Sequence, residues 1–355
     1  MNLPALARAV REHPGLRGKR ELALVAAALG GDGDDAALLP DADGALALAA
    51  EAIHPAFVAA QPRAAGVAGV VTVVNDLAAT GARPLALLDC LVAGARRVAE
   101  ELLEGLRIGA ALYRVPVLGG HATVEDGAPP SLSTFAVGRA RAPLSARNAR
   151  PGDAVTLVAC LEGEMMVGAG SSFFSHLRGP RRERAADDLA LPADAAEAGE
   201  AWAARDVSMP GVAGSLLQLC ESAGGLGCAL DLEALPVPAG LPLERWLLTF
   251  PSYAFLLVGD PAALAERAAA VGLAHAPLGE LDATGVLRLR AGGDEAPVWD
   301  LTKESLTGLR PPARSGRRRA GSRGVRRAWR PARDSRPGWP RGPRRRGGRS
   351  GARAP

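Results

Sequence analysis

Apolar residues recur at helical spacing between Arg63 and Thr80. The positions that share one face of this segment are Val67, Val70, Val74 and Leu77. This spacing predicts a helix over 63–80. Gly81 and Pro84 follow at once and supply the stop signal, because neither residue continues a helix well.

Shorter apolar runs on either side of this helix predict strands. In the first half of the chain we expect strands at 45–53, 85–92, 115–118 and 132–137, and a second helix at 98–113. Helices and strands therefore alternate along the sequence. Such a plan is typical of an α/β (α+β) fold.

The second half begins after a junction at 142–153 that is rich in turn residues. Beyond it we expect strands at 154–160, 228–232, 254–258 and 286–290, an alanine-rich helix at 185–204 and a helix at 211–222. We find no internal repeat. The sequence thus predicts two domains, residues 1–142 and 150–309, each long enough to bury a core of its own.

Residues 310–355 differ from the rest of the chain in composition. Sixteen arginines and one acidic residue lie between 311 and 355, and the apolar residues there show no periodicity. We expect a disordered tail or an out-of-frame extension, because this composition cannot build a core. The alternative is a nucleic-acid arm in which Trp329 and Trp339 stack on bases.

The net charge of +4 hides an acidic body. Before residue 311 the chain carries 26 basic and 37 acidic side chains, a net charge of −11. Such a surface makes nucleic acid an unlikely partner and favours a protein that recruits Mg²⁺. No apolar run is long enough to span a membrane and no signal core precedes the basic N-terminus, so we expect a cytoplasmic protein with reduced cysteines.

Two carboxylate motifs carry the candidate chemistry. The loop 31–37 reads Gly-Asp-Gly-Asp-Asp-Ala-Ala and places Asp32, Asp34 and Asp35 on one turn. Asp76 lies near the end of the 63–80 helix, where the helix dipole repels an anion. Like charges repel one another on the acidic loop, and the helix dipole disfavours the charge of Asp76. Bound Mg²⁺ with nucleotide phosphates would offset both penalties, because Mg²⁺ takes one or two carboxylates together with phosphate oxygens.

Each motif also has a structural interpretation. The acidic loop could be a hairpin or Asx-type turn, although the apolar run 36–39 draws Asp34 and Asp35 toward a protein surface. Asp76, with Thr72 and Thr80 one turn away on either side, could belong to a solvated helix end that prepares the glycine stop.

Further candidates follow strands. Gly119, Gly120 and His121 come after the strand 115–118, where glycines let backbone amides approach a ligand, unless they form a plain turn. His54, close to Glu51, is a weaker candidate.

In the second half, Asp206 precedes the helix at 211 and could hold a metal or act as a cap, with Ser208 a natural N-cap. Asp89 interrupts an apolar strand and needs a partner if it is buried.

Four motifs together resemble the aminoimidazole ribonucleotide (AIR) synthetase superfamily. They are GDDAA at 33–37, VNDLAATGARP at 74–84, LGGH at 118–121 and RPGD at 150–153. The superfamily also contains thiamine-monophosphate kinase, selenophosphate synthetase and the hydrogenase maturation protein that makes the nitrile ligand. The resemblance runs over roughly residues 15 to 309, and the GDDAA start is closest to the kinase branch.

The resemblance implies a two-domain subunit with a C-terminal mixed sheet flanked by helices. N-terminal domains would pair into a β-barrel in a homodimer, and ATP would lie in a cleft between domains. Metal ligands would be Asp34, Asp35, Asp76 and Asp206. The residues that would bind the nucleotide lie in the two acidic motifs and at the glycine pair. They are Gly33, Asp34, Asp35, Asn75, Asp76, Gly119, Gly120 and His121.

This chain departs from the family motifs in the part of the expected cleft that would bind the substrate that accepts the phosphoryl group. Kinase members carry Ser-Asp-Gly where this chain reads Ser208, Met209, Pro210, and Thr-Gly-Asp-Asp-Tyr where it reads Thr-Phe-Pro-Ser-Tyr at 249–253. We therefore expect a Mg-ATP-dependent phosphotransferase or ligase acting on a small metabolite. Thiamine-monophosphate kinase is an alternative, and so is a non-catalytic ATP-binding regulatory or assembly protein.

Overall fold

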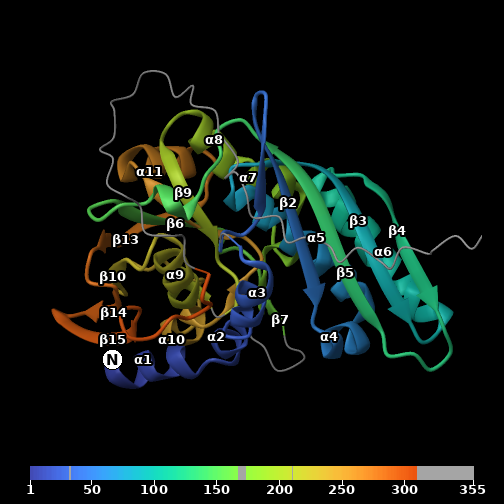
Figure 1. Ribbon diagram of the computed structural model, residues 1–355, viewed down its shortest axis with the longest axis horizontal. Helices are drawn as coiled ribbons and strands as arrows, with labels where there is room; N and C mark the ends of the chain where they lie inside the picture. Colours follow the sequence, from blue (N-terminus) through green and yellow to red (C-terminus); the bar gives the residue numbers. More distant parts are fainter. Residues whose placement is uncertain (32, 167–172, 210, 310–355) are drawn as a thin grey trace, which may run out of the picture. The chain divides into compact units, whose positions relative to one another are not determined.

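A five-stranded sheet with the order β1-β2-β5-β3-β4 forms the first half of the chain (Figure 1). Its strands are β1 (Ala37–Asp41), β2 (Gly44–Ile53), β3 (Arg83–Ala93), β4 (Val117–Val124) and β5 (Ser131–Ala140). Neighbours are antiparallel except β3 and β4, which run parallel. The computed structural model describes residues 1–309 apart from 32, 167–172 and 210, so the expected tail at 310–355 lies outside the described residues.

Two long helices, α5 (Pro62–Ala79) and α6 (Arg96–Tyr113), cover one face of this sheet (Figure 1). They approach closely because glycines meet at their contact. A Cβ on Gly66 would lie 2.3 Å from the Leu102 carbonyl oxygen, and a Cβ on Gly105 would lie 2.0 Å from that of Arg63. The predicted helices at 63–80 and 98–113 are confirmed.

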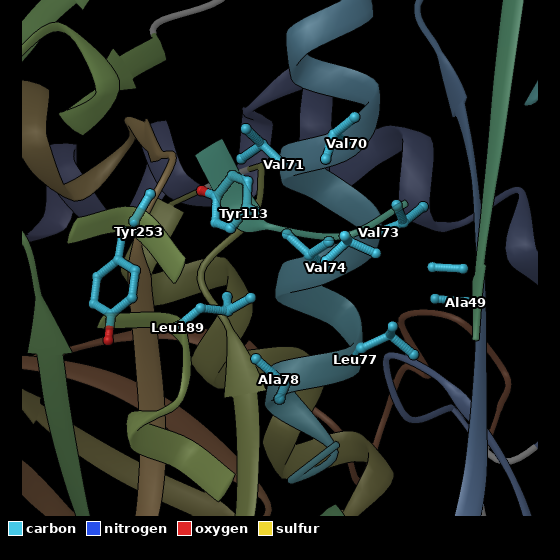
Figure 2. Close-up of a cluster of buried hydrophobic side chains, with 14 of the residues drawn as sticks. Ala49, Val70, Val71, Val73, Val74, Leu77, Ala78, Tyr113, Leu189 and Tyr253 are labelled. Carbon is cyan, nitrogen blue, oxygen red and sulfur yellow. The ribbon is translucent and has the colours of Figure 1, made fainter. Parts of the chain in front are cut away.

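Helix α5 is buried on all sides along its second half. Figure 2 shows Ala49 of β2 on one side of the helix and Tyr113, Leu189 and Tyr253 on the other. The side chains of α5 in this core include Val70, Val71, Val73, Val74, Leu77 and Ala78. One apolar core therefore joins residues of both halves, and its central helix carries Asp76.

A seven-stranded mixed sheet with the order β15-β14-β10-β13-β6-β12-β9 forms the second half. Its strands are β6 (Ala154–Ala159), β9 (Ala201–Asp206), β10 (Gly227–Asp231), β12 (Ala254–Gly259), β13 (Ala274–Asp282), β14 (Val286–Ala291) and β15 (Asp294–Asp300). A small sheet contains β7 (Glu164–Met166), β8 (Phe173–Ser175) and β11 (Phe250–Pro251). The strands predicted at 154–160, 228–232, 254–258 and 286–290 are confirmed.

The remaining helices are shorter. They are α1 (Leu3–Glu12), α2 (Pro14–Lys19), α3 (Leu22–Leu29), α4 (Pro55–Ala60), α7 (Ala185–Leu189), α8 (Leu191–Glu197), α9 (Gly211–Ser222), α10 (Leu243–Leu247) and α11 (Pro261–Ala270). Single 3₁₀ turns lie at Ala146–Asn148, His176–Arg178 and Arg182–Arg184. The helix predicted at 211–222 is confirmed.

The single helix predicted at 185–204 is wrong. Two short helices, α7 and α8, occupy its first part, and Gly199 then turns the chain with φ of 76°. Residues 201–206 form strand β9, which pairs with β12 at the sheet edge. Alanine has the highest helix propensity, but the preference amounts to less than about 1 kcal/mol per residue, so pairing with the buried strand β12 overrides it.

The strand predicted at 115–118 is also wrong in extent. Strand β4 begins at Val117 and continues through Gly119, Gly120 and His121 to Val124, because it pairs in parallel with β3. The glycine pair therefore lies within an edge strand and forms neither a loop nor a plain turn.

Among the described residues, no helix is long and apolar enough to cross a membrane. Three of the four cysteines, Cys160, Cys220 and Cys228, are buried free thiols, while Cys90 is exposed.

Candidate functional site

Three carboxylates from distant parts of the sequence meet at one place. Oxygen atoms of Asp35, Asp76 and Asp206 all lie within 4.8 Å of one another. Asp35 comes from the loop before β1, Asp76 from the last turn of α5 and Asp206 from the end of β9. We call these residues the carboxylate triad.

Direct hydrogen bonds fix the acidic loop against β9. The Asp206 backbone N–H donates to Oδ2 of Asp35 at 3.1 Å, and the Arg205 guanidinium contacts Oδ1 of Asp35 at 2.9 Å. Both side chains of this ion pair are buried, at 5% exposed for Asp35 and 9% for Arg205. The Asp35 carboxylate is therefore oriented by two donors from one strand.

Arg205 also holds the backbone of the acidic loop. It donates to the Gly33 carbonyl at 3.0 Å, and Ser222 donates to the same carbonyl at 2.7 Å. Arg205 was not among the predicted site residues, because an isolated arginine gives no sign of burial or of the residues it faces. Its position directly beside Asp206 in the sequence was the available signal.

Burial and mutual repulsion make the triad costly without a cation. Burial, Asp206, Asp35 and Glu51 raise the pKa of Asp76 well above its usual range. Burial and Asp35 raise the pKa of Asp206 to about 8. Burial also raises the pKa of Glu51. Arg205 pairs with Asp35, and within the described part of the chain no ion pair forms at Asp76, Asp206 or Glu51.

This donor set fits a hard divalent cation. Carboxylate oxygens are the protein ligands that Mg²⁺ takes, and a cation among them would neutralise the like charges that raise these pKa values. Asp76 is only 8% exposed, so the interpretation of a solvated helix end is wrong.

Asp34 is not a member of the carboxylate triad, and its side chain is hydrogen-bonded to the segment at Ser145 and Ala146. Its two carboxylate oxygens accept hydrogen bonds from Ser145 Oγ at 2.6 Å and from the Ala146 backbone N–H at 3.0 Å. These contacts tie the acidic loop to the segment between the two sheets. Neither Asp34 nor Asp35 lies in a hairpin turn, because the hairpin of β1 and β2 turns at Ala42 and Asp43.

Asn75, next to Asp76 on α5, contacts the segment 249–253. Its side-chain amide donates to the Ser252 carbonyl at 3.0 Å, and its Oδ1 has no hydrogen-bond partner within the described residues. Ser252 Oγ in turn contacts His176 Nδ1 at 2.5 Å. The segment 249–253, where kinase relatives carry two aspartates, is therefore held by Asn75 through its backbone.

Gly119, Gly120 and His121 do not join the triad. They lie in an exposed edge strand, where His121 Nε2 contacts Thr123 Oγ1 at 3.4 Å. Gly120 has a packing reason to be glycine, since a Cβ there would lie 2.3 Å from Oδ1 of Asp89.

Two weaker candidates have local contacts. His54 Nδ1 accepts a hydrogen bond from the Ala56 N–H at 3.3 Å and so caps α4. The Ser208 backbone N–H donates to Ser215 Oγ at 3.0 Å at the start of α9.

Comparison with known sequences gives the family. A family model described as AIR synthase related protein, N-terminal domain, matches residues 33–140. An uncharacterised protein of Synechocystis sp. is 33% identical over 293 residues, which are 78% of this chain and 86% of that protein. The chain belongs to the AIR synthase-related superfamily. The phosphoribosylformylglycinamidine synthase subunit PurL of Methanosarcina barkeri is 27% identical over 58% of this AIR synthase-related chain and 32% of its own length.

Solved structures share the fold of this AIR synthase-related protein. PurL of Thermotoga maritima complexed with ATP aligns with a TM-score of 0.63 and 20% identity. That alignment covers 81% of this chain but 48% of PurL, so the chain spans about half of that protein. AaThiL complexed with AMPPCP and TMP aligns with a TM-score of 0.58 and 18% identity, over 78% of this chain and 95% of AaThiL.

Proposed function

We propose that this protein is a Mg-ATP-dependent phosphotransferase or ligase that phosphorylates, or activates by phosphorylation, an oxygen of a small metabolite. The observation that carries the proposal is the convergence of Asp35, Asp76 and Asp206 within 4.8 Å. Two of these carboxylates have raised pKa values because they are buried beside like charges. A site of this kind is stabilised by a divalent cation and by the phosphates that accompany it.

ATP is the proposed nucleotide. Structures with the same fold have been solved with ATP, ADP and AMPPCP. Gly33 and Asn75 lie within two residues of the triad members Asp35 and Asp76 in the sequence, and they are proposed as further nucleotide contacts. Gly119, Gly120 and His121 remain candidates for contacts along the phosphates, and Asp34 for the metal.

The residues of the chain contribute positioning and charge. Bound Mg²⁺ would neutralise phosphate charge during transfer. Asp35, held by Arg205 and the Asp206 N–H, keeps a fixed orientation and needs no rearrangement to serve as a ligand. Burial of Asp76 excludes water from the same place.

The acceptor side supports a substrate other than thiamine monophosphate. Pro251 and Ser252 stand where the kinase branch carries aspartates, and both are buried. The Ser252 carbonyl and hydroxyl are already engaged by Asn75 and His176. Thiamine-monophosphate kinase is the second candidate, and its support is the fold shared with AaThiL.

The same departure motivates a proposal of another class. A protein that kept the nucleotide half of the site and lost the acceptor half would act as an ATP-binding regulatory or assembly protein. Turnover that disappears in an Asp76→Asn variant would exclude it.

We also propose a homodimer formed through the uncovered face of the five-stranded sheet. Leu48, Leu88 and Phe135 are 42%, 49% and 39% exposed on that face, and Phe135 lies directly opposite Leu88 in the register. Apolar side chains gathered on one sheet face favour burial against a second copy. A Phe135→Glu variant should sediment as a monomer while the parent sediments as a dimer; a monomeric parent would contradict this.

The domain division at residues 1–142 and 150–309, with a separate tail at 310–355, is part of the same proposal. The two sheets support it, although the core around α5 contains residues of both halves.

A test of the catalytic proposal is ADP formation by the full chain with Mg-ATP across a panel of small hydroxyl and carboxyl metabolites. We expect at least one acceptor to stimulate ADP formation, and we expect Asp76→Asn to abolish it. Asp43→Asn is the matched control, since Asp43 is an exposed turn residue of the same half. Tight Mg-ATP binding without ADP formation on any acceptor would contradict the catalytic proposal.

A further inference from the structure

Lys19 is the last residue of α2, and α2 is fixed beside the end of β9. Leu16 of this helix is fully buried in the core of the second half. Gly15 packs so tightly that a Cβ there would lie 2.9 Å from Cβ of Met209 and 3.3 Å from its backbone carbonyl carbon. Met209 follows Asp206 by three residues, so the helix that carries Lys19 is anchored next to the triad.

Two other cations near this region are already paired. Arg205 is bound to Asp35 at 2.9 Å. Arg20, directly after Lys19, contacts Glu304 at 2.5 Å and lies over the Trp299 ring at 5.0 Å. Their charges are therefore committed to protein partners.

Lys19 differs from both. Its side chain is half-buried, yet it makes no ion pair or hydrogen bond with the residues that the structure describes. Its positive charge nevertheless opposes the rise in the pKa of Asp76, of Asp206 and of Glu51. Lys19 lies one turn after Gly15 on the same face of α2, the face that packs against Met209, so its half-buried side chain lies on the side of α2 nearest the end of β9 and the triad.

We propose that Lys19 binds a phosphate group of the nucleotide whose Mg²⁺ is held by the carboxylate triad. This inference rests on the proposed function. A polyphosphate carries more negative charge than one Mg²⁺ cancels, so a second cation at the site stabilises the bound form. A lysine ammonium is a compact point charge on a flexible stem, which suits phosphate oxygens in several positions.

A different role for Lys19 is to neutralise the carboxylates themselves. The two roles give opposite results with a metal ion alone. If Lys19 binds phosphate, its removal leaves metal affinity unchanged or raises it, because a repelling charge is lost. If Lys19 is needed to build the carboxylate site, its removal weakens metal binding as well.

The experiment measures binding of Mn²⁺ alone and of Mg-ATP to the full chain by calorimetry. The variants are Lys19→Met, Lys19→Arg and the control Arg17→Met, which removes the same charge from an exposed position of the same helix. We expect Lys19→Met to weaken Mg-ATP binding about tenfold while Mn²⁺ binding stays equal or strengthens. Lys19→Arg should restore most of the ATP affinity, and Arg17→Met should match the parent.

Two results would overturn the inference. One is a Lys19→Met variant that binds Mg-ATP as the parent does. The other is a variant that loses Mn²⁺ and Mg-ATP equally, which would assign Lys19 to the structure of the carboxylate site. A parent that does not bind Mg-ATP would instead reject the proposed function itself, and the inference with it.

Discussion

The backbone N–H of Asp206 donates a hydrogen bond to the carboxylate of Asp35 at 3.1 Å. This contact joins the loop before β1 to the end of β9, and the Arg205 guanidinium reinforces it from the same strand. The carboxylate triad therefore depends on the way the two halves of the chain pack around α5. Its members come together only in the folded protein.

Replacing Asp76 by Asn should stabilise the metal-free protein. The raised pKa of Asp76 means that its charged form is unfavourable when folded, so a neutral residue of the same shape relieves repulsion. We expect the Tm without metal to rise, since about 1 kcal/mol shifts the Tm of a chain this size by roughly 2–4 °C. Added Mg²⁺ should raise the Tm of the parent but not that of the variant. Differential scanning calorimetry would measure both, and a lower Tm for the metal-free variant would contradict the account.

Replacing Arg205 by Gln should destabilise the protein by about 3–5 kcal/mol, because it leaves the buried Asp35 carboxylate without its guanidinium partner. The double variant Arg205→Gln, Asp35→Asn should recover part of this loss, as the charge is then removed too. Urea denaturation would give the free energies of unfolding. Arg107→Gln, at an exposed pair with Glu104, is the control and should change stability little. Equal effects at the two arginines would refute a special role for Arg205.

Gly120→Ala and Gly119→Ala should behave differently although the residues are adjacent. A Cβ at position 120 would lie 2.3 Å from Oδ1 and 2.4 Å from the backbone oxygen of Asp89, whereas at position 119 its nearest neighbour is Leu88 at 3.8 Å. We expect the first variant to lose about 1–3 kcal/mol of stability and the second almost none. Chemical denaturation would give the free energy of unfolding of both variants. Equal free energies for the two variants would contradict the predicted clash at position 120.

His176 should make stability depend on pH in the acidic range. Burial and Arg181 lower the pKa of His176 to about 4 from an ordinary 6.5. Between these values the unfolded chain binds a proton that the folded chain does not, so the free energy of unfolding rises with pH over that window. The full effect is about 3 kcal/mol. Stability curves of the parent and of His176→Gln from pH 4 to 7 would measure it. The difference in slope between them should vanish above pH 7, and parallel curves throughout would argue against a buried neutral His176.

Local patterns gave much of the fold. Helix α5 and helix α9 were predictable because their apolar spacing and glycine stops are strong signals. Strand β9 was not, since its alanines favour helix and only pairing with β12 makes the segment extended. The strand predicted at 115–118 ended too early for a similar reason. Adjacent glycines usually indicate a turn, and only the pairing with β3 shows that Gly119 and Gly120 continue strand β4.

The site shows the same division. Asp35 and Asp76 stand in motifs that signal a carboxylate site on their own. The sequence around Asp206 left a metal ligand and a helix cap equally open, and only the family resemblance implied the metal. Arg205 and Lys19 could not be assigned, because an isolated arginine or lysine gives no sign of burial or of the residues it faces. The different orientations of Asp34 and Asp35 depend on Ser145 and Arg205, which are far away in the sequence.

Whether the carboxylate triad binds Mg-ATP can be measured by calorimetric titration of Mg-ATP into the full chain, beside the variants Asp76→Asn and Asp206→Asn and the control Asp43→Asn. We expect the parent and the control to bind Mg-ATP, and both triad variants to lose at least about tenfold in affinity. Undiminished binding by the two triad variants, or a folded parent that does not bind Mg-ATP, would contradict this expectation.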